Sequence, residues 1–240
     1  MEQAFQREQV LLGREAMERL ARAHVMVVGI GGVGSYAAEG LARAGVGALT
    51  LVDSDTVGLT NLNRQLCALH STLGRNKAEV MAERIADISP QCRVSALAAH
   101  YDEEHKERFF TAPCDYIVDA IDLVSCKLSL ICTALERGIP IISAMGTGNK
   151  LDPTQFCVTD IYKTSGCHLA RILRRELRAR GVKRHTVLYS RELPHAQLES
   201  GEAPPPGRRS VPGSVSWVPS CAGLMLAGYV VQALIRPEAL

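Results

Sequence analysis

Short apolar runs alternate with longer amphipathic stretches over the first 150 residues. The apolar runs have the length and composition of buried strands, and they cover residues 25–28, 49–52, 94–98, 116–120 and 140–144. The stretches between them space apolar residues as helices do, over residues 33–44, 76–88 and 127–136. Strands that alternate with helices predict an α/β fold. We expect a doubly wound, Rossmann-like, mostly parallel sheet with helices on both faces.

The two ends of the chain follow other patterns. Residues 2–22 predict an amphipathic leading helix, and residues 154–161, 168–180 and 187–190 predict a strand, a basic helix and a further strand. Five prolines and three glycines in 193–213 predict a mobile loop. Residues 210–235 carry no charge, but proline and glycine dilute the segment. We therefore interpret it as a buried strand and helix, not a membrane span, in a single domain over 1–240.

Composition narrows the function classes. The net charge is +2, so no global field points to a nucleic acid, and a basic surface must be local. None of the eight cysteines stands in C-x-x-C spacing and no histidine pair has ligand spacing, which argues against zinc. The N-terminus lacks the apolar core of a signal peptide, so we expect a cytoplasmic protein. Whether Cys167 or Cys221 is catalytic stays open.

A glycine-rich turn is the first chemical signal. The run Gly29-Ile-Gly-Gly-Val-Gly34 follows a predicted strand and opens a predicted helix. Such a turn lets the backbone approach phosphate, and the helix N-terminus supplies N–H donors. Asp53 ends the next strand, where a carboxylate accepts hydrogen bonds from ribose hydroxyls. By itself this fingerprint indicates an adenine nucleotide, with NAD as the default.

The segment after Asp53 favours a triphosphate over NAD. It is polar and leads to Arg64, and Lys77 follows thirteen residues later. Arginine offers a fork of donors and lysine a point charge to phosphate oxygens, whereas a hydride-transfer site needs neither. Asp55 and Asp122 are candidate ligands for Mg²⁺, which prefers oxygen. Taken singly, the two cations would more often be surface residues.

Four motifs together resemble the adenylation domain of ubiquitin-activating (E1-like) enzymes. They are G-x-G-G-x-G-S, D-x-D-x-V-x-x-x-N-x-x-R-Q, G-x-x-K and D-A-x-D, over residues 29–35, 53–65, 74–77 and 119–122. The resemblance implies ATP and Mg²⁺ as cofactors and a nucleotide-binding set of Gly29, Gly31, Gly32, Gly34, Ser35, Asp53, Asp55, Asn61, Arg64, Gln65, Lys77 and Asp122. In it, Asp53 holds the ribose and Asp122 the metal. It also implies a homodimer in which Arg7 reaches the partner's site, so that the catalytic set is Arg64, Lys77, Asp122 and Arg7.

Further segments resemble the tRNA threonylcarbamoyladenosine dehydratases within that superfamily. They are residues 45–53, 77–85, 152–164 and 212–219, so the resemblance covers nearly the whole chain. It implies ATP-dependent cyclisation of N6-threonylcarbamoyladenosine in tRNA through a carboxyl-adenylate, and it leaves open a sulfur-transfer partner of the cysteine-desulfurase type. Residues 207–213 lack the cysteine that some members carry there. The alternative is an enzyme that adenylates the C-terminus of a ubiquitin-like or sulfur-carrier protein, but the missing C-x-x-C pairs argue against it.

A local basic cluster fits an RNA substrate. Residues 168–191 contain eight lysines and arginines but one acid, Glu176, although the whole chain is near neutral. Clusters of this kind bind the phosphate backbone of nucleic acids, whereas a solvated arginine-rich helix is the plain alternative. The tRNA-binding set that we predict is Arg171, Arg174, Arg175, Arg178, Lys183 and Arg184. Arg208 and Arg209 add to it in the predicted loop.

Overall fold

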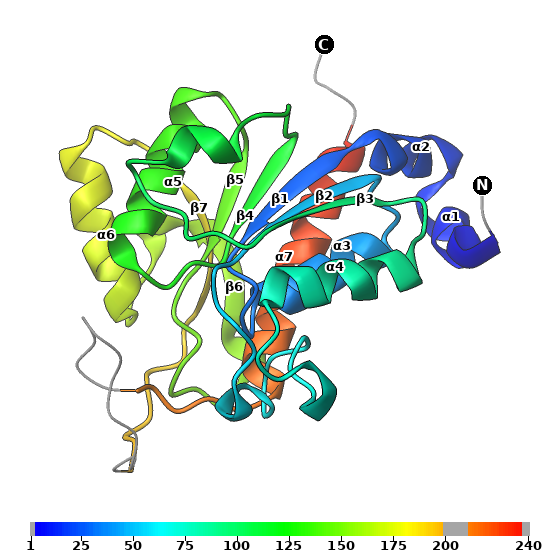
Figure 1. Ribbon diagram of the computed structural model, residues 1–240. Coiled ribbons are helices and arrows are strands. Elements are labelled where there is room, and N and C mark those ends of the chain that lie inside the picture. The colour runs from blue at the N-terminus through cyan, green and yellow to red at the C-terminus, as the bar shows by residue number, and fades with distance from the viewer. Residues whose placement is uncertain (1–2, 199–210, 237–240) are drawn as a thin grey trace.

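Seven strands form one sheet in the order β3-β2-β1-β4-β5-β7-β6 in the computed structural model, which describes residues 3–198 and 211–236 (Figure 1). The strands are β1 (His24–Val28), β2 (Ala48–Val52), β3 (Arg93–Leu97), β4 (Tyr116–Asp119), β5 (Ile141–Ala144), β6 (Phe156–Asp160) and β7 (Thr186–Ser190). Every neighbouring pair is parallel except β6 and β7. The predicted α/β fold with a doubly wound, mostly parallel sheet is confirmed.

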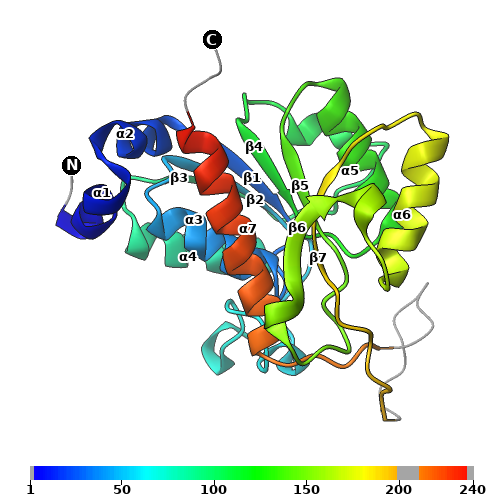
Figure 2. The same cartoon turned by 180° about the vertical axis from the view of Figure 1, so that it is seen from behind.

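Helices cover both faces of this sheet, as Figures 1 and 2 show from opposite sides. One layer contains α2 (Arg14–Arg22), α3 (Gly34–Arg43), α4 (Lys77–Ile88) and α7 (Trp217–Ile235); the other contains α5 (Val124–Glu136) and α6 (His168–Ala179). In β1, Val25 and Val27 pack in the first layer, whereas Met26 and Val28 pack in the second. Because side chains alternate along a strand, a central strand buried on both faces must be apolar throughout.

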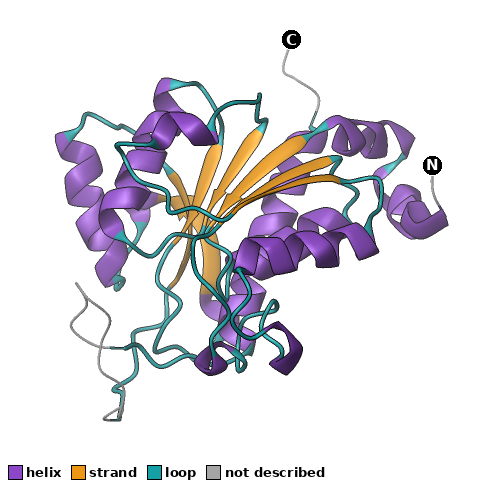
Figure 3. Cartoon of the chain, in the orientation of Figure 1, coloured by secondary structure: helices purple, strands orange, loops and turns teal. Residues whose placement is uncertain are grey.

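The leading segment differs from the prediction. In place of one helix over 2–22, the described residues form η1 (Gln3–Phe5), α1 (Gln6–Leu12) and α2, while residue 2 lies outside them. Gly13 separates α1 from α2 with φ of 85°, a left-handed conformation that breaks a helix and that glycine adopts at little cost. The other short 3₁₀ helices, visible among the loops of Figure 3, are η2 (Leu59–Asn61), η3 (His70–Thr72), η4 (Lys106–Phe109), η5 (Pro153–Gln155) and η6 (Ile161–Lys163).

The predicted terminal strand is wrong: residues 211–216 form no regular element before α7. By length and composition α7 is apolar enough to cross a membrane. It packs on α3 so closely that a Cβ on Gly223 would lie 2.3 Å from the carbonyl oxygen of Val33, and one on Gly40 2.7 Å from Ala227 Cβ. The small residues of α7 therefore face a neighbouring helix. Of the predicted mobile loop 193–213, residues 199–210 lie outside the described part, as do Arg208 and Arg209.

The sheet order fixes where a ligand can bind. Strands β1 and β4 are neighbours, but the chain leaves β1 toward β2 on one side and β4 toward β5 on the other. At such a switch point the loops separate, and a crevice opens beyond the carboxyl ends of the strands. The loops after β1, β2 and β4 carry most of the predicted nucleotide-binding residues, so the fold brings them to one edge.

Candidate active site

The glycine turn between β1 and α3 is folded as the sequence predicts. Gly29 has φ of 90°, and a Cβ there would lie 2.7 Å from the carbonyl oxygen of Ala120. A Cβ on Gly34 would lie 1.7 Å from the carbonyl oxygen of Gly29. Gly31 is different, because a Cβ there would come only within 3.9 Å of Gln65 Nε2. Gly29 and Gly34 are therefore needed to close the turn, whereas Gly31 leaves its backbone open to a ligand.

Asp53 ties the glycine turn to the loop after β2. Its Oδ2 accepts a hydrogen bond from Ile30 N at 2.6 Å, and its Oδ1 accepts one from Asp55 N at 2.8 Å. Burial raises the pKa of Asp53, although the hydrogen bond from Asp55 and the charge of Lys77 oppose this shift. The carboxylate thus lies beside the turn, where the sequence predicts a ribose partner.

Lys77 begins α4 and points back to the same edge. Asn76 caps the helix, since its side chain accepts hydrogen bonds from the backbone N–H groups of Ala78 and Glu79. Lys77 Nζ lies 2.8 Å from Asp55 Oδ2, with the lysine side chain 7% exposed and the carboxylate 68% exposed. Asp55, predicted as a candidate metal ligand, is thus an ion-pair partner of Lys77 in this structure.

The predicted residues between β2 and α4 make local contacts. Asn61 Oδ1 accepts a hydrogen bond from Gly58 N at 3.0 Å, which holds the η2 turn. Arg64 Nη1 donates to the carbonyl oxygen of Thr60 and to Asn63 Oδ1, both at 2.9 Å. The loop therefore orders its own polar side chains.

Ser35 and Gln65 connect this loop to the glycine turn. Ser35 Oγ donates to the carbonyl oxygen of Gly31 at 2.6 Å and accepts from Leu66 N at 3.2 Å. Gln65 is buried beside Gly31. Pro219 at the start of α7 closes the other side, because a Cβ on Gly32 would lie 3.2 Å from Pro219 Cβ. The turn is thus supported by two segments that are distant from it in sequence, the loop at 65–66 and the start of α7.

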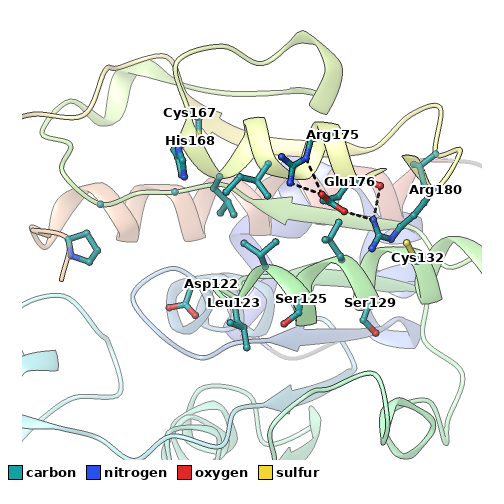
Figure 4. A pocket seen from close by; sticks show the side chains of 18 of the residues that line it. Asp122, Leu123, Ser125, Ser129, Cys132, Cys167, His168, Arg175, Glu176 and Arg180 are labelled. Atoms are coloured by element: carbon teal, nitrogen blue, oxygen red, sulfur yellow. Dashed lines mark hydrogen bonds and ion pairs between the residues drawn. The ribbon is translucent and has the colours of Figure 1, made fainter. Parts of the chain in front are cut away.

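Asp122 lines a groove between α5 and α6. The groove, about 1640 Å³ in volume, runs between α5 and α6 and shares Asp122 with the predicted nucleotide-binding set, but not Gly29, Asp53 or Lys77. Figure 4 shows Asp122 and Ser125 on one wall and His168, Arg175 and Arg180 on the other. Asp122 is exposed, and no group of three or more potential metal ligands occurs among the described residues. Any metal here would need oxygen atoms from a ligand as well.

The basic helix α6 exposes most of the predicted tRNA-binding residues, but their contacts differ. Arg174 is half-buried and donates to the carbonyl and hydroxyl oxygens of the buried Thr164. Arg178 lies over the Tyr162 ring, 5.2 Å from its centroid. Arg175 pairs with Glu176, and Arg171 contacts His168. Lys183 and Arg184 are exposed beyond the helix. Arg174 therefore has a structural partner, whereas the other five extend along the surface.

Arg7 and the two candidate cysteines lie apart from the glycine turn and the loop after β2. Arg7 is exposed on α1, which lies beside α2 and away from the loops after β1, β2 and β4 (Figure 1). Its own chain's site is therefore out of reach. Cys167 precedes α6 and lines the groove, whereas Cys221 lies within α7.

A buried polar network, which the sequence did not predict, lies behind the site. Asp119 ends β4, Lys127 lies in α5, Ser143 in β5, and His185 directly before β7. All four are buried. Only Asp119 belonged to a motif. The other three look like ordinary residues until the strand order places β4 beside β5 and β5 beside β7.

A glycine turn, an acid after β2 and a lysine at the carboxyl edge of a doubly wound sheet define a nucleotide-binding α/β protein. The chain belongs to the ThiF family, whose model matches residues 5–239. It is 44% identical to the tRNA threonylcarbamoyladenosine dehydratase of Bacillus subtilis, over 97% of this chain and 94% of that protein. Crystal structures of the Escherichia coli enzyme of that name with AMP and with ATP are 36% identical and cover 97% of this chain and 94% of theirs, with TM-scores of 0.89 and 0.87. The resemblance drawn from the motifs is confirmed.

Proposed function

We propose that this protein uses ATP to dehydrate N6-threonylcarbamoyladenosine in tRNA to its cyclic form. The observation that carries the proposal is the extent of the similarity to the B. subtilis dehydratase, 97% of one chain and 94% of the other. That extent includes the basic helix as well as the nucleotide edge. Activators of carrier proteins also resemble this chain, but over a smaller part, as in the 36% identity over 129 residues to a molybdopterin-synthase adenylyltransferase.

In this proposal the carboxyl edge binds ATP. The open backbone at Gly31 and the N-terminus of α3 receive phosphate oxygens, and Asp53 accepts hydrogen bonds from the ribose. Asn61, Arg64 and Lys77 hold the remaining phosphate oxygens, Lys77 by exchanging part of its contact with the exposed Asp55. The relatives crystallised with AMP and ATP support this assignment.

Asp122 has the chemistry and the position of a magnesium ligand. Mg²⁺ typically binds one or two protein carboxylates together with substrate phosphates, and Asp122 is an exposed carboxylate at the edge where the phosphates would lie. A bound Mg²⁺ would neutralise phosphate charge as pyrophosphate leaves. Asp122 would hold and orient that ion, while Lys77 and Arg64 supply fixed positive charge.

The reaction divides into two substitutions. A carboxylate oxygen of the threonine moiety attacks the α-phosphorus of ATP, a new O–P bond forms, and pyrophosphate leaves. A nucleophilic atom of the carbamoyl group then attacks the activated acyl carbon and closes a ring, while the C–O bond breaks and AMP leaves with that oxygen. One proton is released from the carbamoyl group. The nucleoside thus loses the elements of water, and the protein's part is alignment and charge stabilisation.

The RNA would approach over α6. Arg171, Arg175, Arg178, Lys183 and Arg184 are exposed there, and such cations bind backbone phosphates without reading sequence. The groove between α5 and α6 leads from this surface to Asp122, which gives an unstacked modified nucleotide a route to the nucleotide edge. Arg174 instead stabilises the loop at Thr164.

We also propose a cytoplasmic homodimer in which Arg7 completes the partner's site. Exposed Val10 and Leu11 on α1 and exposed Leu224 and Met225 on α7 provide apolar surface for a subunit interface. Arg7 lies away from the nucleotide edge of its own chain, as a residue that acts on a second subunit must. A sulfur-transfer partner of the cysteine-desulfurase type belongs to the same proposal.

The test is to incubate the protein with ATP, Mg²⁺ and tRNA that carries threonylcarbamoyladenosine. We expect AMP release together with a nucleoside lighter by one water. The same tRNA without the modification, and the Asp122→Ala variant, should give neither product. AMP formation with a carrier protein but not with the modified tRNA would contradict the proposal and favour the carrier-activating alternative.

A further inference from the structure

A fully buried ion pair lies directly behind the candidate active site. Lys127 Nζ is 2.8 Å from Asp119 Oδ2, and both side chains are 0% exposed. The ammonium group also donates to the carbonyl oxygens of Ile121, at 2.9 Å, and of Asp119, at 3.4 Å. A lysine has three N–H donors, so these three acceptors use them all.

Fold stability alone is a poor reason for such a pair. Removing two charges from water is costly, and replacing a buried pair by apolar residues of similar volume is often neutral or stabilising. The surrounding core of α5 is apolar, with Leu128, Leu130 and Ile131 buried beside Lys127. An apolar residue at 127 would suit that packing. The pair therefore needs a second explanation, which its hydrogen bonds supply.

These bonds fix the backbone that joins β4 to Asp122. Asp119 Oδ1 accepts from Ile121 N at 3.1 Å, while Lys127 holds the carbonyl oxygens of Asp119 and Ile121. Ala120, which lies between these residues, packs directly against the glycine turn: a Cβ on Gly29 would lie 2.7 Å from the carbonyl oxygen of Ala120. The loop that ends at Asp122 is thus clamped to the turn that is proposed to bind phosphate.

A second contact holds Asp119 from the other side. Ser143 Oγ donates to Asp119 Oδ2 at 2.6 Å, and His185 Nε2 lies 2.8 Å from the same Ser143 oxygen. Since the serine has already donated its hydrogen to the carboxylate, it accepts from His185, which places the imidazole proton on Nε2. His185 Nδ1 has no hydrogen-bond partner in the described structure, so in this tautomer it is an unprotonated acceptor that no donor reaches. Asp119 is therefore oriented by Lys127 from α5 and by Ser143 from β5, and His185 in turn holds Ser143.

We propose that Lys127 is a positioning residue: with Asp119 it holds the 119–122 loop against Gly29 and so places Asp122 at the nucleotide phosphates. The inference rests on the proposed ATP site, but not on the identity of the RNA substrate. It assigns Lys127 no contact with ATP. Its effect should be seen in nucleotide binding before any chemistry.

The experiment measures ATP affinity by calorimetry, with Mg²⁺ and with EDTA, alongside thermal unfolding. Lys127→Met leaves Asp119 buried without its cation, so this variant should lose stability and Mg²⁺-dependent ATP affinity together. The informative variant is the double change Asp119→Asn with Lys127→Met, which removes both buried charges. Ser143→Ala, which keeps the ion pair, is a second informative variant. Thr133→Val is the matched control, because Thr133 is buried on the same helix and its hydroxyl is hydrogen-bonded to neither Asp119 nor Asp122 in the described structure.

If Lys127 is a positioning residue, the double variant should regain much of the stability lost in Lys127→Met. Its ATP affinity with Mg²⁺ should nevertheless stay about 10-fold or more below that of the wild type. Ser143→Ala should show a smaller loss of the same kind, and Thr133→Val none. A double variant that regains both stability and an ATP affinity within twofold of the wild type would overturn the inference. If the double variant does not fold, unchanged ATP affinity in Ser143→Ala would overturn it instead. A wild-type protein that binds ATP but leaves modified tRNA unchanged would refute the proposed function alone.

Discussion

The surroundings of Lys77 favour a role in binding over a role in stability. Its side chain is nearly buried at the start of α4, but its ion-pair partner Asp55 is two-thirds exposed. Exposed partners contribute little to stability, since water screens them. A buried cation that faces a solvent-exposed acid at a nucleotide edge is instead well placed to receive a phosphate.

We therefore expect Lys77→Met to keep the fold and to lower AMP formation by about 10²-fold or more, the usual loss when one charge-stabilising donor is removed. Arg75→Ala is the control, since Arg75 lies two residues earlier and pairs with the exposed Glu83. Its rate should stay near that of the wild type. Equal losses in both variants, or a Lys77→Met rate near normal, would contradict a phosphate-binding role.

His185 gives the protein a defined sensitivity to acid. Burial and the nearby charge of Lys127 lower the pKa of its imidazole from 6.5 to about 3. The unfolded chain binds a proton below pH 6.5 that the folded chain refuses, so stability is full above that pH and falls as the pH drops toward 3.

Between pH 7 and pH 5 this histidine alone should remove about 2 kcal/mol of unfolding free energy, at about 1.4 kcal/mol per pH unit. Urea unfolding of the wild type and of His185→Asn at several pH values tests this. The two curves should diverge by that amount as the pH falls, whatever their offset at pH 7. Parallel curves would mean that His185 takes up its proton as readily in the folded protein as in the unfolded chain.

At the scale of elements, α6 combines anchoring and exposed arginines on one short helix. Arg174 reaches back to Thr164, whereas Arg175 is exposed on the same helix. Lys183 and Arg184 are exposed just beyond the helix. A pattern of charge along the sequence does not separate these cases. It is the direction of each side chain around the helix that decides which arginine is available to RNA.

Removing Lys183 or Arg184 should therefore affect tRNA binding, whereas removing Arg174 should affect stability. Lys183→Ala and Arg184→Ala should each weaken tRNA binding and reduce the slope of log affinity against log salt by about 1, with no change in melting temperature. Arg174→Ala should instead lower stability by about 1–2 kcal/mol and leave that slope unchanged. Filter binding at several salt concentrations, paired with thermal unfolding, measures both. A reduced slope in Arg174→Ala would contradict this division.

Most of the helices and strands could be predicted from the sequence, but two features could not. Alternating apolar runs and the turn at Gly29–Gly34 were sufficient for the sheet and the nucleotide edge, because both depend on local periodicity and local backbone geometry. The break at Gly13 was missed because the flanking residues are good helix formers. The absent strand over 211–216 was missed because apolar composition does not distinguish a strand from coil packed under a helix.

The buried network of Lys127, Ser143 and His185 could not be predicted in the same way. Each partner lies on a different element, and their contact depends on the order β4-β5-β7, which sequence patterns do not determine. Lys127, which directly follows Cys126 in an apolar helix, is the one visible sign in the sequence, since a cation there needs a buried partner. The close approach of Gly223 to Val33 is a further feature that only the packing of α7 on α3 defines.

For the whole molecule, the question is whether one subunit contains a complete site. In the proposed homodimer Arg7, which lies on α1 away from the nucleotide edge of its own chain, completes the partner's site. Arg7→Ala and Asp122→Ala homodimers should both be inactive. Mixed and reassembled, they should recover about a quarter of wild-type activity, since half the dimers are mixed and each has one intact site. No recovery from mixed dimers, or an active Arg7→Ala protein, would contradict a shared site.

The central claim, that the carboxylate of the modified nucleoside is adenylated before the ring closes, can be tested with an isotope. The tRNA would carry oxygen-18 in the carboxylate of its threonylcarbamoyl group, and the AMP released during cyclisation would be analysed by mass spectrometry. Attack of that carboxylate on the α-phosphorus predicts one atom of oxygen-18 in each AMP formed. Cyclised nucleoside accompanied by unlabelled AMP, or by ADP and labelled phosphate, would contradict a carboxyl-adenylate.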